Sequence, residues 1–167
     1  MPSLKSLAAR LGSPFFEDFA FDRAAIDSRR VKPGTLFFAL PGQKTDGHAF
    51  VADVLGAGGA AVVSKSGYTG AVLEVDSVPE ALLEAGRWAR EAMDFPVVGI
   101  TGSNGKTTTR RMITRALSPG FTVSETQGNL NNHLGLPLTL LNTPGGTEML
   151  VLEMGMNHPG ELLRLGW

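Results

Sequence analysis

Residues 97–117, VVGITGSNGKTTTRRMITRAL, constrain the fold of this chain more than any other stretch. Four apolar residues are followed by a loop with two glycines, and then by a segment free of glycine and proline that can form about three helical turns. An apolar strand that leads through a glycine loop into a helix is typical of α/β domains with a parallel sheet. The sequence therefore predicts a strand over 97–100 and a helix over 106–117.

Short apolar strands alternate with helices on both sides of this segment, so both halves of the chain are predicted to be α/β. Further strands are expected at 35–40, 60–64, 71–75, 121–125 and 149–154. Further helices are expected at 4–11, 48–59 and 78–93, and from His158 onward, while 136–141 is expected to be an apolar turn or helix. Ser3 and Gly12 are a suitable cap and stop for the first of these helices.

The break MDFP at 93–96 predicts a domain boundary, with a small α/β substrate domain over 1–94 and the start of a parallel-sheet ATPase domain over 95–167. A parallel sheet needs helices on both faces, and the second half offers few of them. Met1 is typical of a true start and Trp167 of a cut. We therefore expect the N-terminal portion of a longer enzyme, inactive as an enzyme by itself.

Composition excludes several classes of protein. The net charge is −1 and there is no basic tail, so no nucleic-acid partner is expected. There are no cysteines, which excludes disulfides and thiolate zinc sites. No apolar run approaches the roughly 20 residues that span a bilayer, and no signal segment precedes the first helix. The expected location is the cytoplasm.

The loop at 101–108 has the chemistry of a phosphate-binding loop. Backbone N–H groups at a helix N-terminus attract anions, and Gly102 and Gly105 allow the backbone to approach them closely. Lys106 would place a cation against terminal phosphates, and the Thr107 hydroxyl would hold Mg²⁺. The common G-x-x-x-x-G-K-[ST] pattern requires glycine where this chain has Ile100. The alternative is a glycine-rich turn with an incidental lysine.

Four segments resemble the Mur ligases, the ATP-dependent amide-bond ligases of peptidoglycan precursor synthesis. They are TGSNGKTT at 101–108, DSRRVKPGTLFFALPGQKTDGHAF at 27–50, GNLNNHLGLPLTLLN at 128–142 and LEMGMNHPGEL at 152–162. The last two are similar to the members of the family that add D-alanyl-D-alanine. The resemblance covers nearly the whole chain but well under half of a family member.

The resemblance implies that UDP-MurNAc-tripeptide, D-Ala-D-Ala and ATP give UDP-MurNAc-pentapeptide, ADP and phosphate through an acyl phosphate. It also implies Mg²⁺ as cofactor and a monomer. Two alternatives stay open: a ligase that adds the third amino acid to UDP-MurNAc-dipeptide, and a P-loop nucleotide-binding module without ligase activity. The nucleotide-binding residues that it implies are Gly102, Ser103, Asn104, Gly105, Lys106, Thr107 and Thr108.

The resemblance also assigns roles outside the loop. Glu153 ends an apolar strand, and Glu153 and Thr107 are the expected metal ligands; Lys106 and Glu153 are the expected catalytic residues. Ser28 and Arg29 resemble residues that contact the uridine nucleotide.

Three further sets of residues are less specific. Asn129 and Asn132 are expected to line the substrate cleft, although asparagines, including Asn131 between them, also form turns. Asp46-Gly47-His48 is expected to be a turn and helix cap that supports the uridine pocket. The arginines of helix 106–117 are interpreted as its solvated face; they are Arg110, Arg111 and Arg115.

Overall fold

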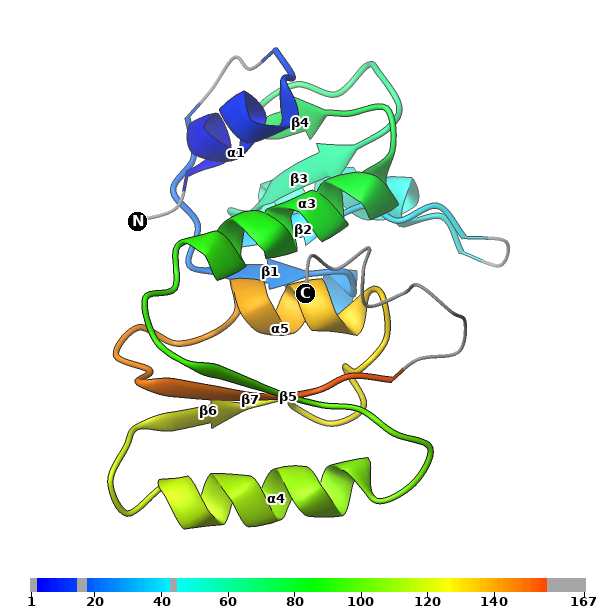
Figure 1. Ribbon diagram of the computed structural model, residues 1–167. Helices are drawn as coiled ribbons and strands as arrows, with labels where there is room; N and C mark the ends of the chain where they lie inside the picture. Colours follow the sequence, from blue (N-terminus) through cyan, green and yellow to red (C-terminus); the bar gives the residue numbers. More distant parts are fainter. Residues whose placement is uncertain (1–2, 15–17, 43–44, 156–167) are drawn as a thin grey trace. The chain divides into compact units, whose positions relative to one another are not determined.

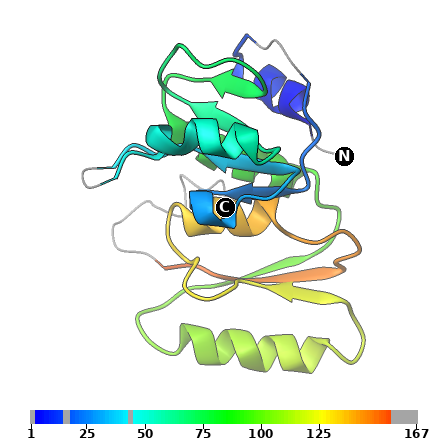
Figure 2. The same cartoon turned by 180° about the vertical axis from the view of Figure 1, so that it is seen from behind.

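The computed structural model describes residues 3–14, 18–42 and 45–155 of the chain. The chain forms two compact units, Met1–Ala85 and Gly86–Trp167, and each is built from helices and a parallel sheet (Figures 1 and 2). The predicted α/β class is confirmed. The functional boundary expected after residue 94 remains a prediction. Among the described residues, no helix combines the length and apolar character that a membrane crossing needs.

The sheet of the first unit has four parallel strands in the order β1-β2-β3-β4. They are β1 (Arg23–Ala25), β2 (Thr35–Phe38), β3 (Ala60–Val63) and β4 (Val72–Glu74). All residues of β2 and β3 are buried, as expected for the central strands of a parallel sheet covered on both faces. β1 was not predicted, because three residues that include an arginine carry no apolar periodicity.

Helical elements surround this sheet. They are α1 (Leu4–Leu11), the 3-10 turns η1 (Ser28–Arg30) and η2 (Gly47–Phe50), α2 (Val51–Gly56) and α3 (Val78–Glu91), whose residues from Gly86 onward belong to the second unit. α1 has the predicted ends: Ser3 caps its N-terminus in a capping box, and Gly12 ends it in the left-handed conformation.

The core of the first unit lies on the two faces of β2 and β3. Phe37 and Val63 pack against Val51 and Val54 of α2 on one face. Side chains alternate along a strand, so the fully buried Phe38 points to the other face, which α3 covers (Figures 1 and 2).

The second unit contains a three-stranded parallel sheet in the order β5-β7-β6. Its elements are β5 (Val97–Ile100), α4 (Lys106–Leu117), β6 (Val123–Glu125), α5 (Gly135–Leu141) and β7 (Met149–Glu153). Ile100 is paired with Glu153 and Glu125 with Val151, so all three strands end at one edge. The predicted side-by-side arrangement of 97–100 and 149–153 is confirmed.

Helices cover both faces of this second sheet. α4 lies against one face, and α5 lies against the other (Figures 1 and 2). Leu136 and Leu140 of α5 pack with Leu150 and Leu152 of β7. The predicted helix from His158 lies outside the described residues.

Gly135 begins α5 where the backbone leaves no room for a side chain. An added Cβ would lie 2.5 Å from the carbonyl carbon of Leu130. Alanine favours a helix over glycine by about 1 kcal/mol, but this contact is with backbone that has to move. We expect Gly135→Ala to lower the free energy of unfolding by about 1–3 kcal/mol.

Gly56 in α2 is the matched control for this prediction, because an added Cβ there would meet no described atom within 4 Å apart from its chain neighbours and its own helix backbone. Gly56→Ala should leave stability unchanged or raise it by up to about 1 kcal/mol. Chemical denaturation of both variants measures the difference. Equal effects would contradict the close approach at Leu130.

Candidate active site

The glycine loop between β5 and α4 turns sharply into the helix. Gly102 has φ of 140° and Gly105 has φ of 76°, which are values that side chains other than glycine rarely adopt. Gly105 is the N-cap of α4, and residues 101–105 are exposed. The first N–H groups of a helix have no acceptor within it, so the start of α4 presents donors and a partial positive charge to solvent.

Lys106 is the first residue of α4 and lies over this loop. Its Nζ donates a hydrogen bond of 2.6 Å to the carbonyl oxygen of Gly102. The ammonium group is therefore held beside the exposed loop, where an anion at the helix N-terminus would meet it.

Glu153 ends the central strand β7 and is only 3% exposed. Its Oε2 accepts a hydrogen bond of 2.9 Å from Oγ1 of Thr107, and its Oε1 accepts one of 2.8 Å from Nδ2 of Asn131. The structure thus brings together the two expected metal ligands, Glu153 and Thr107, beside the loop that carries Lys106.

The sequence did not predict that a residue of the asparagine loop after β6 contacts Glu153. Asn131 does so, and its carbonyl oxygen accepts a hydrogen bond of 2.6 Å from the N–H of Gly155. Asn132 instead accepts hydrogen bonds from the N–H groups of Leu134 and Gly135, which starts α5. Asn129 is exposed. The substrate roles of Asn129 and Asn132 remain predictions.

Arg110 corrects the interpretation of the α4 arginines. Arg111 and Arg115 are exposed as predicted, but Arg110 is only 4% exposed. Arg110 follows Thr107 by three residues and therefore shares its helix face, which packs on the sheet. The three-residue spacing from Thr107 already places Arg110 on this face. Arginine is rarely buried without a partner, however, so the residue type predicted an exposed side chain.

In the first unit, Ser28 and Arg29 lie in η1 directly after β1. Asp27 caps this turn by accepting from the N–H of Arg29. The Arg29 guanidinium also forms an ion pair with Asp27 at 2.7 Å while remaining 87% exposed. That hydrogen-bonded guanidinium lowers the pKa of Asp27 from 3.8 to about 2. The predicted uridine-contacting arginine is thus held by a neighbouring carboxylate and remains accessible.

A second polar cluster joins the ends of β2 and β3 around a buried histidine. Asp46 caps η2 as predicted, and its Oδ1 lies 2.7 Å from Nδ1 of His48. Nε2 of His48 accepts a hydrogen bond of 2.9 Å from the N–H of Ser64, so the ring proton resides on Nδ1 and is donated to Asp46. Lys65 completes the cluster with an ion pair of 2.5 Å to Oδ2 of Asp46.

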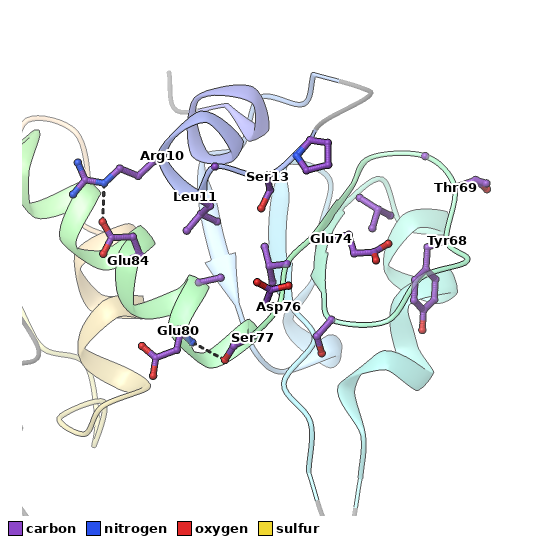
Figure 3. A pocket seen from close by; sticks show the side chains of 17 residues that line it. Arg10, Leu11, Ser13, Tyr68, Thr69, Glu74, Asp76, Ser77, Glu80 and Glu84 are labelled. Carbon is purple, nitrogen blue, oxygen red and sulfur yellow. Dashed lines mark hydrogen bonds and ion pairs between the residues drawn. The ribbon is translucent and has the colours of Figure 1, made fainter.

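A cavity of about 1230 Å³ opens in the first unit between the end of α1, the segment after β4 and the start of α3 (Figure 3). Its walls carry Glu74, Asp76, Glu80 and Glu84, with Arg10 paired to Glu84 at 2.7 Å. Four carboxylates facing a single guanidinium would repel a diphosphate. The cavity is therefore a poor place for a nucleotide.

Comparison with known proteins agrees with this geometry. Residues 23–87 match the family described as Mur ligase family, catalytic domain, and residues 100–166 match the Mur ligase middle domain. The chain belongs to the Mur ligase family, which confirms the resemblance seen in the sequence.

Several relatives within this family are UDP-N-acetylmuramoyl-tripeptide–D-alanyl-D-alanine ligases. The UDP-N-acetylmuramoyl-tripeptide–D-alanyl-D-alanine ligase of Bacillus subtilis (strain 168) is 41% identical over 157 residues, which are 91% of this chain and 34% of that ligase. The chain thus spans about a third of the length of the curated relatives it matches.

Solved structures of MurF, the ligase that adds D-alanyl-D-alanine, are also similar to this chain. MurF from Acinetobacter baumannii has a TM-score of 0.85 at 34% identity, covering 96% of this chain and 37% of that chain. MurF from Thermotoga maritima, solved in complex with ADP, has a TM-score of 0.77 at 35% identity, covering 86% of this chain and 34% of that chain.

Asp46 provides a test of the polar cluster through pH. The hydrogen bond from Lys65, followed by those from the backbone and ring of His48, lowers the pKa of Asp46 below its usual 3.8. A lowered pKa contributes stability that is fully present above pH 3.8 and is lost as the pH falls below that value. Asp46→Asn should therefore flatten the decrease in unfolding temperature over this acidic range.

Asp53→Asn, which removes an exposed carboxylate on α2, is the control for this prediction and should retain the wild-type pH profile. Thermal unfolding followed by circular dichroism between about pH 2 and 6 would measure both. Parallel profiles for Asp46→Asn and the wild type would contradict the role of Asp46.

Proposed function

We propose that this chain is part of an ATP-dependent ligase that joins D-Ala-D-Ala to UDP-MurNAc-tripeptide in peptidoglycan precursor synthesis. The observation that carries the proposal is the Glu153 carboxylate, buried at the end of β7 and hydrogen-bonded to Thr107 directly beside the Lys106 loop. Membership of the Mur ligase family and the MurF relatives support the same reaction.

The residues at this edge of the sheet suit ATP with Mg²⁺. Mg²⁺ in phosphoryl-transfer sites takes one or two protein oxygens and completes its shell with phosphate and water. A buried carboxylate and a hydroxyl 2.9 Å from it, Glu153 and Thr107, are such a donor set. Within the described residues no group of three acidic or histidine side chains could form a metal cage, which fits an ion shared with a nucleotide.

The chain's own residues supply binding and orientation. The loop from Gly102 to Thr108 and the Lys106 ammonium group hold the phosphates of ATP, while Thr107 and Glu153 would hold the metal. Bound Mg²⁺ neutralises charge that develops on the phosphate oxygens. The preorganised N–H groups and the cation of Lys106 stabilise the same charge without having to reorganise.

The proposed reaction has two steps. A carboxylate oxygen of the tripeptide attacks the γ-phosphorus, and the bond to the bridging oxygen of ADP breaks, giving an acyl phosphate and ADP. The amine nitrogen of D-Ala-D-Ala then attacks the acyl carbon, phosphate leaves, and the amine loses its proton as the amide forms.

The first unit is proposed to bind the uridine nucleotide through Ser28 and Arg29. The exposed Arg29 guanidinium suits a diphosphate or a planar base, whereas the acidic cavity of Figure 3 does not. Asn129 and Asn132 are proposed to face the peptide part of the substrate. The cytoplasmic location and the monomeric state remain predictions.

The two alternatives are weaker. A ligase for the third amino acid would share the 27–50 segment, but the matched relatives named above add D-alanyl-D-alanine. A P-loop module without ligase activity would not need the first unit, which matches the Mur ligase family over 23–87.

The test of the function is ligation by the complete natural polypeptide that contains these residues. With ATP, Mg²⁺, UDP-MurNAc-tripeptide and D-Ala-D-Ala, we expect pentapeptide by mass spectrometry and one phosphate per product. Lys106→Ala should lower this rate by about 100- to 1,000-fold, because it removes a cation from the transferring phosphoryl group. UDP-substrate affinity should stay unchanged in that variant.

Three outcomes would contradict this proposal. Product with UDP-MurNAc-dipeptide and a single amino acid instead would establish the third-residue ligase. ATP binding without product from either substrate pair would establish the non-ligase module. Loss of UDP-substrate affinity in Lys106→Ala would show that the two binding sites are wrongly assigned.

Glu153→Gln tests the metal assignment, because glutamine keeps the shape of the side chain and removes its charge. We expect activity or metal affinity to fall by about 10- to 100-fold, with a raised Mg²⁺ requirement. Glu148→Gln is the control, since Glu148 is exposed at the other end of β7 and accepts from the N–H of Thr122. Normal turnover of Glu153→Gln at low Mg²⁺ would remove Glu153 from the site.

A further inference from the structure

Arg110 brings a buried cation to the inner face of α4. Thr107, Arg110 and Thr114 follow one another at helical spacing, and α4 packs on β6 and β7. Thr107 donates to Glu153, while Thr114 donates to Glu125 at 2.8 Å. Arg110 therefore lies on the helix between two residues that each hold a carboxylate.

The contacts of the guanidinium group reach both of these carboxylates. Nη1 of Arg110 lies 3.8 Å from Oε2 of Glu153 and donates a hydrogen bond to the carbonyl oxygen of Thr126. Nε lies 3.5 Å from Oε2 of Glu125 but makes no hydrogen bond with any described residue. The Arg110 side chain is 5% exposed, so solvent screens these interactions only weakly.

Thr126 extends the connection to the backbone. Its Oγ1 accepts a hydrogen bond of 2.9 Å from the N–H of Glu153, and its own N–H donates to Val151 at 3.1 Å. Arg110 thus holds the carbonyl of the residue whose side chain fixes the main chain of Glu153. The side chain and the backbone of Glu153 are both linked to this one guanidinium.

We propose that Arg110 is a positioning residue that holds the Glu153 carboxylate beside Thr107 in the orientation that binds the metal of the nucleotide. This inference rests on the function proposed above. The planar fork of arginine contacts the Thr126 carbonyl and a carboxylate at once, whereas lysine is a single point charge. Side chains that orient a metal ligand typically change metal affinity by about 10- to 100-fold.

A positioning role of Arg110 and a purely electrostatic role predict opposite effects on Mg²⁺ binding when Arg110 is removed. A cation 3.8 Å from the ligand Glu153 repels a metal, so removing it would strengthen Mg²⁺ binding if charge alone mattered. If Arg110 positions Glu153, its removal weakens Mg²⁺ binding.

The experiment measures ADP binding to the complete natural polypeptide by titration calorimetry, over a series of Mg²⁺ concentrations and in EDTA. Arg110→Met should raise the half-saturating Mg²⁺ concentration by about 10- to 100-fold, and Arg110→Lys by less. ADP affinity in EDTA should stay at the wild-type value, because the Lys106 loop is intact. Arg111→Met, the matched exposed arginine on α4, should match the wild type throughout.

Each other outcome overturns a defined part of this inference. Unchanged or tighter Mg²⁺ binding in Arg110→Met overturns the positioning role, as does an equal loss of ADP affinity in EDTA, which indicates a merely structural role. If Arg110→Met does not fold, Arg110→Lys decides, and a wild-type Mg²⁺ response there overturns the role. A wild type whose ADP binding ignores Mg²⁺ overturns the proposed function and this proposal together.

Discussion

A carboxylate at the buried end of a central parallel strand needs partners, and the second unit is arranged around those of Glu153. Burying a charge without partners costs several kcal/mol or more, on the order of the whole stability of a small domain. Thr107 from α4 and Asn131 from the loop before α5 supply the hydrogen bonds, and Arg110 supplies the nearby charge. One side chain therefore joins the elements that cover the two faces of the sheet.

This arrangement depends on the register of the strands. β7 lies between β5 and β6, and the pairs Ile100–Glu153 and Glu125–Val151 bring the ends of all three strands to one edge. A shift of one residue would turn Glu153 to the other face of the sheet, away from α4. The buried apolar side chains of β7 resist such a shift, because they would exchange the α5 face for the α4 face.

Much of this arrangement can be predicted from the sequence, because the strands and the glycine loop are encoded by patterns of neighbouring residues. Apolar runs predicted β2, β3, β5 and β7, and the glycine loop predicted that α4 begins at Lys106. Thr107 and Glu153 were paired correctly because parallel strands end at the same edge. The burial of Arg110 and the choice of Asn131 over its neighbours were missed, since both depend on contacts between segments that no local pattern encodes.

The hydrogen bond from Lys106 to the Gly102 carbonyl occupies one of the three N–H donors of the ammonium group. The other two donors can meet an anion while this 2.6 Å contact stays in place, so the carbonyl fixes the position of the cation and leaves its charge available. A polyphosphate carries several acceptor oxygens, so it can accept from this fixed ammonium group and from the N–H groups at the start of α4 at once.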